Sequence, residues 1–332
     1  MDYRHLGRSG MTVSAISYGN WITHGDQVDE EAAIACVHAA LDVGITTFDT
    51  ADVYAGGAAE ETLARALAGQ RRDSVEICTK VYWPMGARSN HRGLSRKHII
   101  EACHASLGRL KTDHIDLYQA HRYDVEAPLE ETLRAFDDLV RAGKVNYVGV
   151  SEWTAGQIEA ATQMARDMGL DSIVANQPQY SLLWRVIEPE ILPLCRREGI
   201  GQIVWSPLAQ GVLTGKYRVG QQRPQESRAG SESRATDMGR FLDEAVLSRV
   251  EEFAKLCAEA GLAPGNVALA WVLDTPGISS AIVGASRPGQ IIDNAGALEV
   301  DLTSDFKSAV EAVLGPVCVD DPSRVSQLER RP

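Results

Sequence analysis

Several common functional signals are missing from this sequence of 332 residues. No apolar run is long enough to span a bilayer, and the first residues show no basic-then-apolar signal pattern. We therefore expect no membrane insertion and a cytoplasmic location. The cysteines form no CxxC pair and no metal-ligand spacing, so we expect reduced packing thiols and no metal site. They are widely separated along the chain: Cys36, Cys78, Cys103, Cys195, Cys257 and Cys318.

Positive charge is also in short supply. The chain has 33 basic and 45 acidic residues, and its formal net charge is −12. This balance argues against nucleic acid or an anionic membrane surface as the main partner, although it leaves room for a local basic pocket that binds a phosphate. No Gly-x-Gly-x-x-Gly pattern follows any expected strand, which weighs against a doubly wound dinucleotide-binding domain.

What the chain does contain is an alternation of strand and helix patterns. Strands are expected at residues 16–21, 46–49, 74–81, 114–121, 145–151, 172–177, 200–206 and 280–284. Helices are expected at residues 29–42, 58–68, 95–107, 128–141, 154–168, 188–197, 243–260, 266–274 and 290–297. Strict alternation predicts parallel strands joined by helical crossovers, and eight such units close into a barrel better than they extend an open sheet. We therefore predict a single (β/α)8 barrel domain over residues 1–332, preceded by a β-hairpin at residues 3–6 and 12–16.

A long polar segment interrupts the alternation at residues 210–240. It is rich in Gly, Pro, Ser and charged residues. A loop of this length inside a compact domain is typically functional or disordered. Because it follows the seventh strand, we expect it at the carboxyl rim of the barrel, over any ligand bound there.

Four polar residues fall at or just beyond the carboxyl ends of neighbouring strands. Asp49 ends the second strand, Tyr54 follows in its loop, Lys80 lies near the end of the third strand, and His121 ends the fourth. Adjacent barrel strands bring these ends together, so the four side chains are expected to share one cavity. Lys80 lies in an apolar run and needs a partner, because burying an unpaired ammonium is costly; Asp49 is the natural one.

The chemistry of these four residues is coherent. A free phenol has a pKa of about 10, and a nearby ammonium is expected to lower the pKa of Tyr54 by about one to three units. His121 can donate to a carbonyl oxygen or relay a proton. The set is typical of proton delivery to an oxygen while a cofactor supplies hydride. The alternative is a buried Asp49–Lys80 pair with an aromatic residue and a histidine nearby and no catalysis.

The motif Phe48-Asp49-Thr50-Ala51-x-x-Tyr54, followed by Lys80 and His121, resembles the catalytic tetrad of the aldo-keto reductases in order and setting. The resemblance covers about nine tenths of the chain. Further motifs are most similar to the branch that contains the potassium-channel β-subunits and their bacterial relatives: residues 93–100, 205–209, 215–217 and 284–286.

The resemblance implies a barrel that binds NADP(H) in extended form and reduces small carbonyl substrates, aldehydes or ketones, to alcohols. It implies that Tyr54 is the general acid, that Lys80 and Asp49 tune it, and that His121 orients the carbonyl. It further implies that Arg228 clamps the 2′-phosphate and that Trp205 lies against the nicotinamide ring. The other implied cofactor-binding residues are Gly19, Asn20, Trp21, Asp49, Ser151, Gln177, Ser206, Leu208, Gly211, Lys216, Gly284, Ser286, Gln290, Asp293 and Asn294. The implied substrate pocket consists of Trp21, Tyr54, Tyr82, Trp83 and His121, and for Tyr82 and Trp83 plain packing is an equally open reading.

The chain also departs from the pattern of the family. Glu152 follows Ser151 where many relatives carry Asn, and a carboxylate cannot donate to the nicotinamide carboxamide, so Glu152 is left out of the expected site. His121 stands where the channel β-subunits carry Asn, which favours an active reductase. The resemblance nevertheless keeps a second reading open, a redox-sensing NADP(H)-binding accessory subunit of a membrane or regulatory partner. It also implies a possible homo-oligomer. A third reading, a barrel lyase or isomerase with a Schiff base at Lys80, is disfavoured by Asp49 and Tyr54.

Overall fold

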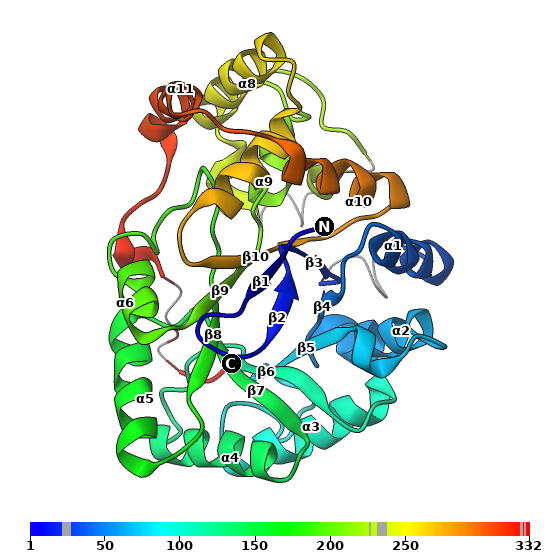
Figure 1. The fold of residues 1–332 in the computed structure, drawn as a ribbon, viewed down its shortest axis with the longest axis vertical. Helices are drawn as coiled ribbons and strands as arrows, with labels where there is room; N and C mark the ends of the chain where they lie inside the picture. The colour runs from blue at the N-terminus through cyan, green and yellow to red at the C-terminus, as the bar shows by residue number, and fades with distance from the viewer. Residues whose placement is uncertain (22–27, 226, 231–237, 326–327, 329) are drawn as a thin grey trace.

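The computed structural model describes residues 1–21, 28–225, 227–230, 238–325, 328 and 330–332. Its centre is a closed barrel of eight parallel strands in the order β10-β3-β4-β5-β6-β7-β8-β9 (Figure 1). The strands are β3 (Ile16–Gly19), β4 (Thr47–Asp49), β5 (Glu76–Val81), β6 (Ile115–Ala120), β7 (Val145–Ser151), β8 (Ile173–Gln177), β9 (Gly201–Val204) and β10 (Ile278–Val283). The expected eight-stranded barrel is therefore confirmed, with each strand inside or within two residues of its predicted position.

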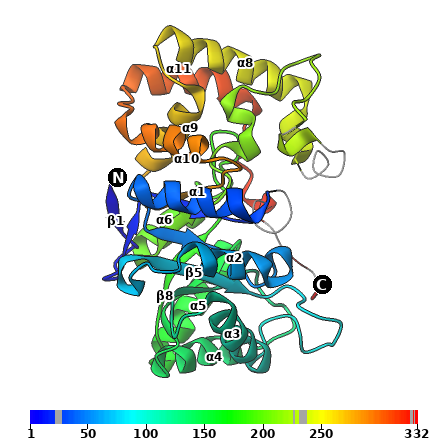
Figure 2. The ribbon, with the colours of Figure 1, turned by 90° about the vertical axis from the view of Figure 1, so that its right-hand side faces the viewer.

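Helices surround the barrel (Figures 1 and 2). They are α1 (Glu30–Asp42), α2 (Ala58–Ala66), α3 (Arg96–Leu110), α4 (Leu129–Arg141), α5 (Ala155–Met168), α6 (Ile191–Glu198), α8 (Glu244–Glu259), α9 (Pro264–Asp274), α10 (Pro288–Ala295) and α11 (Ser304–Leu314). Side-chain caps start several of them. Asp29 accepts from the Ala32 amide, Ser95 from the His98 amide, and Thr154 forms a capping box with Gln157. These caps satisfy amides that the first helical turn leaves without partners.

The N-terminal hairpin closes the amino end of the barrel. Its strands β1 (Tyr3–His5) and β2 (Thr12–Ser14) pair antiparallel, as predicted. Leu6, Met11 and Val13 are buried and pack against inward-facing apolar residues of the barrel strands. The hairpin thus occupies the amino end of the barrel, and the carboxyl end is the one at which barrels of this kind bind ligands.

Helix α11 was not expected from the sequence, which was read as ending its regular structure at residue 297. Thr303 caps this helix, and Val310 and Leu314 are buried in a second apolar cluster together with residues of α8 and α9. Figure 2 shows α8 and α11 lying together at one end of the molecule. This helix extends the fold beyond the eight repeating units, so the repeat gave no reason to expect it.

The segment after β9 contains short 3-10 turns: η3 (Ala209–Thr214), η4 (Arg228–Gly230) and η5 (Gly239–Leu242). Tyr217, Ala229, Met238 and Phe241 from this region are buried in the same cluster as α8 and α9. The segment is therefore anchored to the helical layer by a few apolar side chains spaced along its polar sequence.

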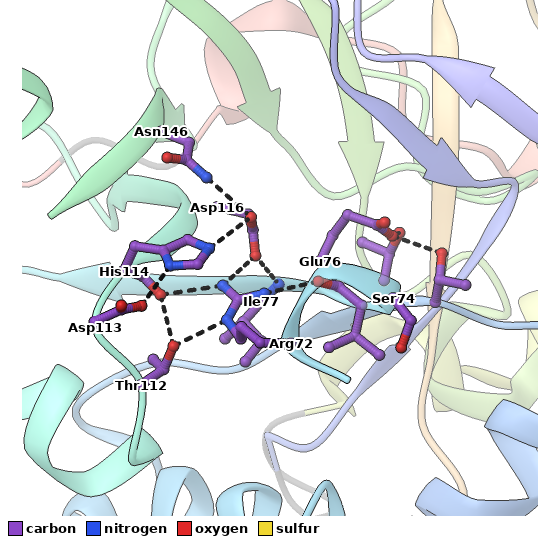
Figure 3. A network of polar contacts seen from close by, with 12 residues as sticks. Arg72, Ser74, Glu76, Ile77, Thr112, Asp113, His114, Asp116 and Asn146 are labelled. Carbon is purple, nitrogen blue, oxygen red and sulfur yellow. Dashed lines mark hydrogen bonds and ion pairs between the residues drawn. The ribbon is translucent and has the colours of Figure 1, made fainter. Parts of the chain in front are cut away.

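A polar network joins the amino ends of β4 to β7 (Figure 3). Asp116 accepts from Arg72, from the Ile77 amide at 2.8 Å and from Asn146 at 3.1 Å. Glu76 accepts from the hydroxyls of the two threonines that lead into β4. The network connects four neighbouring strands at the end opposite to the predicted site.

Among the described residues, no single helix is both long and apolar enough to cross a membrane; α8 and α9 meet that test only as a pair bent by 93°.

Candidate active site

The carboxyl ends of the barrel strands surround a cavity of about 580 Å³. Its inner part is lined by Asp49, Tyr54, His121, Trp83 and Trp205. From there the cavity extends past the loop after β9 toward the loop after β10 and the first turns of α10. Asp49, Tyr54 and His121, which were predicted from the sequence to lie together, therefore line one cavity. Lys80 lies behind them.

Lys80 and Asp49 form a buried ion pair. The Lys80 Nζ donates to Asp49 Oδ2 at 2.6 Å and to the Thr50 carbonyl at 2.8 Å, and its side chain is fully buried. Gln177 Nε2 donates to the other Asp49 oxygen at 2.8 Å. Burial alone would lower the pKa of Lys80, but Asp49 and the neighbouring Tyr54 outweigh it and raise that pKa. The ammonium therefore stays charged and fixed in position.

Tyr54 lies against this pair. Its hydroxyl is 3.4 Å from Lys80 Nζ, which also lies 5.1 Å from the centre of the phenol ring. The side chain is half-buried and lines the cavity. Burial raises the pKa of Tyr54, Asp49 adds to the increase, and Lys80 offsets only part of it. The sequence-based expectation of a lowered pKa was therefore wrong, because the cost of burying a phenolate exceeds the attraction of the ammonium.

His121 forms the opposite wall. Its ring lies edge-on to Tyr54, with centroids 5.8 Å apart, and to Trp83 at 6.2 Å. The imidazole is 7% exposed, and its Nδ1 is buried without a hydrogen-bond partner among the described residues. Burial, with help from the positive charges of Lys80 and Arg122, holds the pKa of His121 well below its usual value. The ring is therefore neutral near pH 7 and presents one donor and one acceptor.

Comparison with known proteins identifies the family of this chain. The family model described as "Aldo/keto reductase family" matches residues 15–314. The chain belongs to the aldo/keto reductase family. Two curated relatives carry the name "Probable voltage-gated potassium channel subunit beta". The one from Oryza sativa subsp. japonica is 41% identical over 319 residues, which is 95% of this chain and 97% of the relative. The one from Arabidopsis thaliana is 41% identical over 303 residues, 90% and 92% of the two chains.

Membership in this oxidoreductase family agrees with the recognition made from the tetrad motif, and most of the expected cofactor residues line the cavity. These are Gly19, Trp21, Asp49, Ser151, Gln177, Trp205, Ser206, Leu208, Gly211, Lys216, Gly284, Ser286, Gln290 and Asn294. Within this set, Gln290 Oε1 accepts from the Ser286 amide at 2.8 Å, which fixes the loop after β10 to the start of α10. Ser227, Gln210 and Thr214 also line the cavity and were not predicted.

Backbone strain is concentrated in the loop after β9. Ser206, Ala209 and Gln210 have φ of 52°, 46° and 59°, a region that residues with a side chain seldom adopt. A Cβ at Gly211 would meet Lys216 Nζ at 2.8 Å, so the lysine chain crosses directly over this glycine. Strained backbone of this kind persists at functional loops because the surrounding structure holds it in place.

The remaining predicted residues are not brought to the cavity wall. Tyr82 is fully buried, packs edge-on against Trp83 and belongs to the apolar core, so of the two aromatic residues only Trp83 faces the cavity. Asn20 is buried and its Nδ2 donates to the Ala59 carbonyl at 3.1 Å. Asp293 is exposed on α10 and is absent from the lining. The side chain of Arg228 lies outside what the structure describes, so its predicted phosphate contact stays a prediction.

Glu152 is the residue that sequence reasoning left out. It directly follows β7, has a φ of 56° and is 6% exposed. Its Oε1 accepts from Trp205 Nε1 at 2.9 Å and from the Gln179 amide at 2.6 Å. Its position next to Ser151 was the available signal that it lies near the site. The sequence-based argument excluded it because a carboxylate cannot donate to the cofactor carboxamide, but a carboxylate can accept from an indole N–H.

Proposed function

We propose that this chain is an NADPH-dependent carbonyl reductase that converts aldehydes or ketones to alcohols. The observation that carries the proposal is the position of the Tyr54 hydroxyl, at the cavity wall and 3.4 Å from the ammonium of a buried Lys80–Asp49 pair. A protonated phenol at this place can donate to an oxygen that gains negative charge. Family membership supports the oxidoreductase class of the reaction.

The lining residues fit a nicotinamide dinucleotide. The inner end offers an aromatic face on Trp205 and the hydrogen-bonding side chains of Ser151 and Gln177, which suit a ring with a carboxamide. The middle offers Lys216 and the strained loop after β9, which suit a pyrophosphate. The outer end offers the first turns of α10, whose amino terminus attracts negative charge. When bound, the reduced cofactor supplies the hydride.

The tetrad residues then have separate tasks. Tyr54 donates its hydroxyl proton to the carbonyl oxygen as that oxygen becomes an alkoxide. Lys80 carries a fixed positive charge beside the phenol and stabilises the phenolate left after proton transfer, while Asp49 holds the ammonium in place. Neutral His121 donates a hydrogen bond to the substrate oxygen and orients the carbonyl. The high pKa of Tyr54 keeps the acid protonated at neutral pH, as reduction requires.

The decisive experiment mixes the purified protein with NADPH and an aromatic aldehyde and follows the loss of reduced-nicotinamide absorbance. We expect turnover by the wild type and its loss in Tyr54→Phe. Turnover by Tyr54→Phe at the wild-type rate would overturn the proposed mechanism. Preference for NADPH over NADH is proposed to come from Arg228, so Arg228→Ala should weaken NADPH binding far more than NADH binding. Equal weakening would remove Arg228 from the phosphate site.

A second candidate is a redox-sensing accessory subunit that binds NADP(H) and turns over only incidentally. The names of the relatives favour it, because both are named as channel β-subunits. His121 in the cavity wall favours turnover, because it places a hydrogen-bond donor beside the substrate carbonyl. Tight retention of NADP(H) with negligible turnover across a carbonyl panel, together with co-purification of a membrane partner, would favour the accessory role.

A further inference from the structure

The hydrogen bond between Glu152 and Trp205 joins a charged residue to the wall of the reactive end of the cavity. The Trp205 indole is part of that wall. Its ring centroid lies 6.2 Å from that of Trp21, and the Trp21 centroid lies 6.4 Å from that of Tyr54. A hydride donor must lie within contact distance of the carbonyl that Tyr54 protonates. The nicotinamide of the proposed function therefore lies between Tyr54 and Trp205, beside the indole that Glu152 holds.

The surrounding structure holds the Glu152 side chain in a defined position. It is 6% exposed, and two N–H donors converge on its Oε1. Its backbone has a φ of 56°, a conformation that costs free energy for a residue other than glycine. No lysine, arginine or histidine in the described part of the chain forms an ion pair with it. Within the described residues, its carboxyl group therefore has N–H hydrogen-bond donors but no ion-pair partner for its negative charge.

The other charges at the reactive end do not cancel it. The Lys80 ammonium is matched by Asp49 at 2.6 Å, so that pair contributes little net charge. Arg122 lines the cavity, but its guanidinium lies over the Trp83 ring at 5.6 Å, on the substrate side. On the side of Trp205, Glu152 bonds directly to the indole, whereas the Lys216 ammonium lies farther along the same loop, over Gly211 and the Tyr217 ring. A carboxylate bonded to the indole N–H also increases the electron density of the ring face, which attracts a cation stacked on it.

We propose that Glu152 sets the relative affinity of the site for the two redox states of the cofactor, favouring the oxidised form. The oxidised nicotinamide ring carries a positive charge and the reduced ring is neutral, so a buried negative charge beside the ring stabilises the oxidised form alone. Glu152 acts through Trp205 and through its field, and is thus a positioning residue. The inference rests on the proposed function, because it requires that NADP(H) binds in this cavity.

The test compares the dissociation constants of NADP⁺ and NADPH for wild type and Glu152→Gln, measured by quenching of tryptophan fluorescence. Glutamine keeps an oxygen that can accept from Trp205 and from the Gln179 amide, while the charge is removed. We expect the variant to bind NADP⁺ about tenfold more weakly and to bind NADPH within about twofold of the wild type. The matched control is Glu159→Gln, which removes the same charge from an exposed residue of α5 and should leave both constants unchanged.

The outcomes separate the two claims. If the wild type binds neither form, the proposed function fails. If the wild type binds both and Glu152→Gln changes the two constants by the same factor, Glu152 has only a structural role and this inference is wrong. If the control shifts the ratio as much as Glu152→Gln, the effect belongs to overall charge and the inference is again wrong. A melting temperature of Glu152→Gln within a few degrees of that of the wild type shows that the variant is folded, so that its dissociation constants can be compared.

Discussion

Two carboxylate–cation pairs lie at opposite ends of the same barrel. At the amino end, Asp116 binds Arg72, a backbone amide and Asn146, and both of its oxygens have partners (Figure 3). At the carboxyl end, Asp49 binds Lys80 and Gln177, and the pair lies directly beneath the hydroxyl of Tyr54 at the cavity wall. Both pairs join neighbouring strands, but the second also lies against the proposed proton donor at the edge of a cavity.

The difference indicates what the proposed catalysis requires of a buried ion pair in this barrel. Both carboxylates have partners on each oxygen, so the difference lies in the cation: Lys80 Nζ also lies 3.4 Å from the hydroxyl of Tyr54, which lines the cavity. At the amino end the N-terminal hairpin fills the barrel interior. At the carboxyl end the loops leave a cavity, so the field of the Lys80–Asp49 pair acts on a group that can meet a substrate.

Replacing Lys80 should have the largest effect, because it serves both stability and chemistry. We expect Lys80→Met to lower the free energy of unfolding by about 3–5 kcal/mol, since Asp49 would stay buried without its cation, and to abolish aldehyde reduction. Denaturant unfolding and a steady-state assay measure the two effects. The double variant Lys80→Met/Asp49→Asn should recover most of the stability and none of the activity. A single variant as stable as the wild type would contradict the buried-pair reading.

Tyr54→Phe should separate chemistry from stability. We expect kcat/KM for an aldehyde to fall by about a thousandfold, the size of a lost general acid, while the melting temperature and the Kd for NADPH stay close to wild-type values. The effect should lie in kcat, because the hydroxyl acts in the transition state. A loss confined to KM would show that Tyr54 binds substrate without donating a proton.

The matched change at the amino end is Asp116→Ala. It leaves the Ile77 amide and the Arg72 guanidinium without their acceptor, so we expect the free energy of unfolding to fall by about 2 kcal/mol. Activity per folded molecule should be unchanged at a temperature well below the melting transition. If kcat fell in step with stability, the two ends of the barrel would be coupled, and their roles would not be separate.

The smallest expected effect is a pH dependence that belongs to His121. Its pKa in the folded protein lies well below that of an exposed histidine, so below about pH 6.5 the unfolded chain binds a proton that the folded chain does not. This residue's contribution to stability is present above that pH and is lost as pH falls. Between about pH 6 and 5, the free energy of unfolding of the wild type should fall more steeply than that of His121→Asn, by up to about 1.4 kcal/mol per pH unit. Parallel stability curves for the two proteins would exclude a neutral buried imidazole.

The sequence shows its barrel and its tetrad clearly for related reasons. Strand and helix patterns are local, and a closed parallel barrel places the carboxyl ends of all its strands on one rim. Asp49 and His121 could therefore be assigned to a common cavity from the sequence alone. Lys80 could be paired with Asp49 because an isolated ammonium in an apolar strand is too costly. Helix α11 was missed because it belongs to no repeating unit, although Thr303 and its apolar spacing were available as local signals.

Other features depend on distances that no local pattern contains. Glu152 and Trp205 are 53 residues apart, and only folding brings the carboxylate to the indole. The direction of the Tyr54 pKa shift depends on how deeply the fold buries this side chain, and the structure reversed the sequence-based expectation. Residue types along the chain thus determined the fold class and the chemical roles available at the rim. Tertiary structure decided which groups are desolvated and which charges are cancelled, because electrostatic free energies depend on depth and separation in three dimensions.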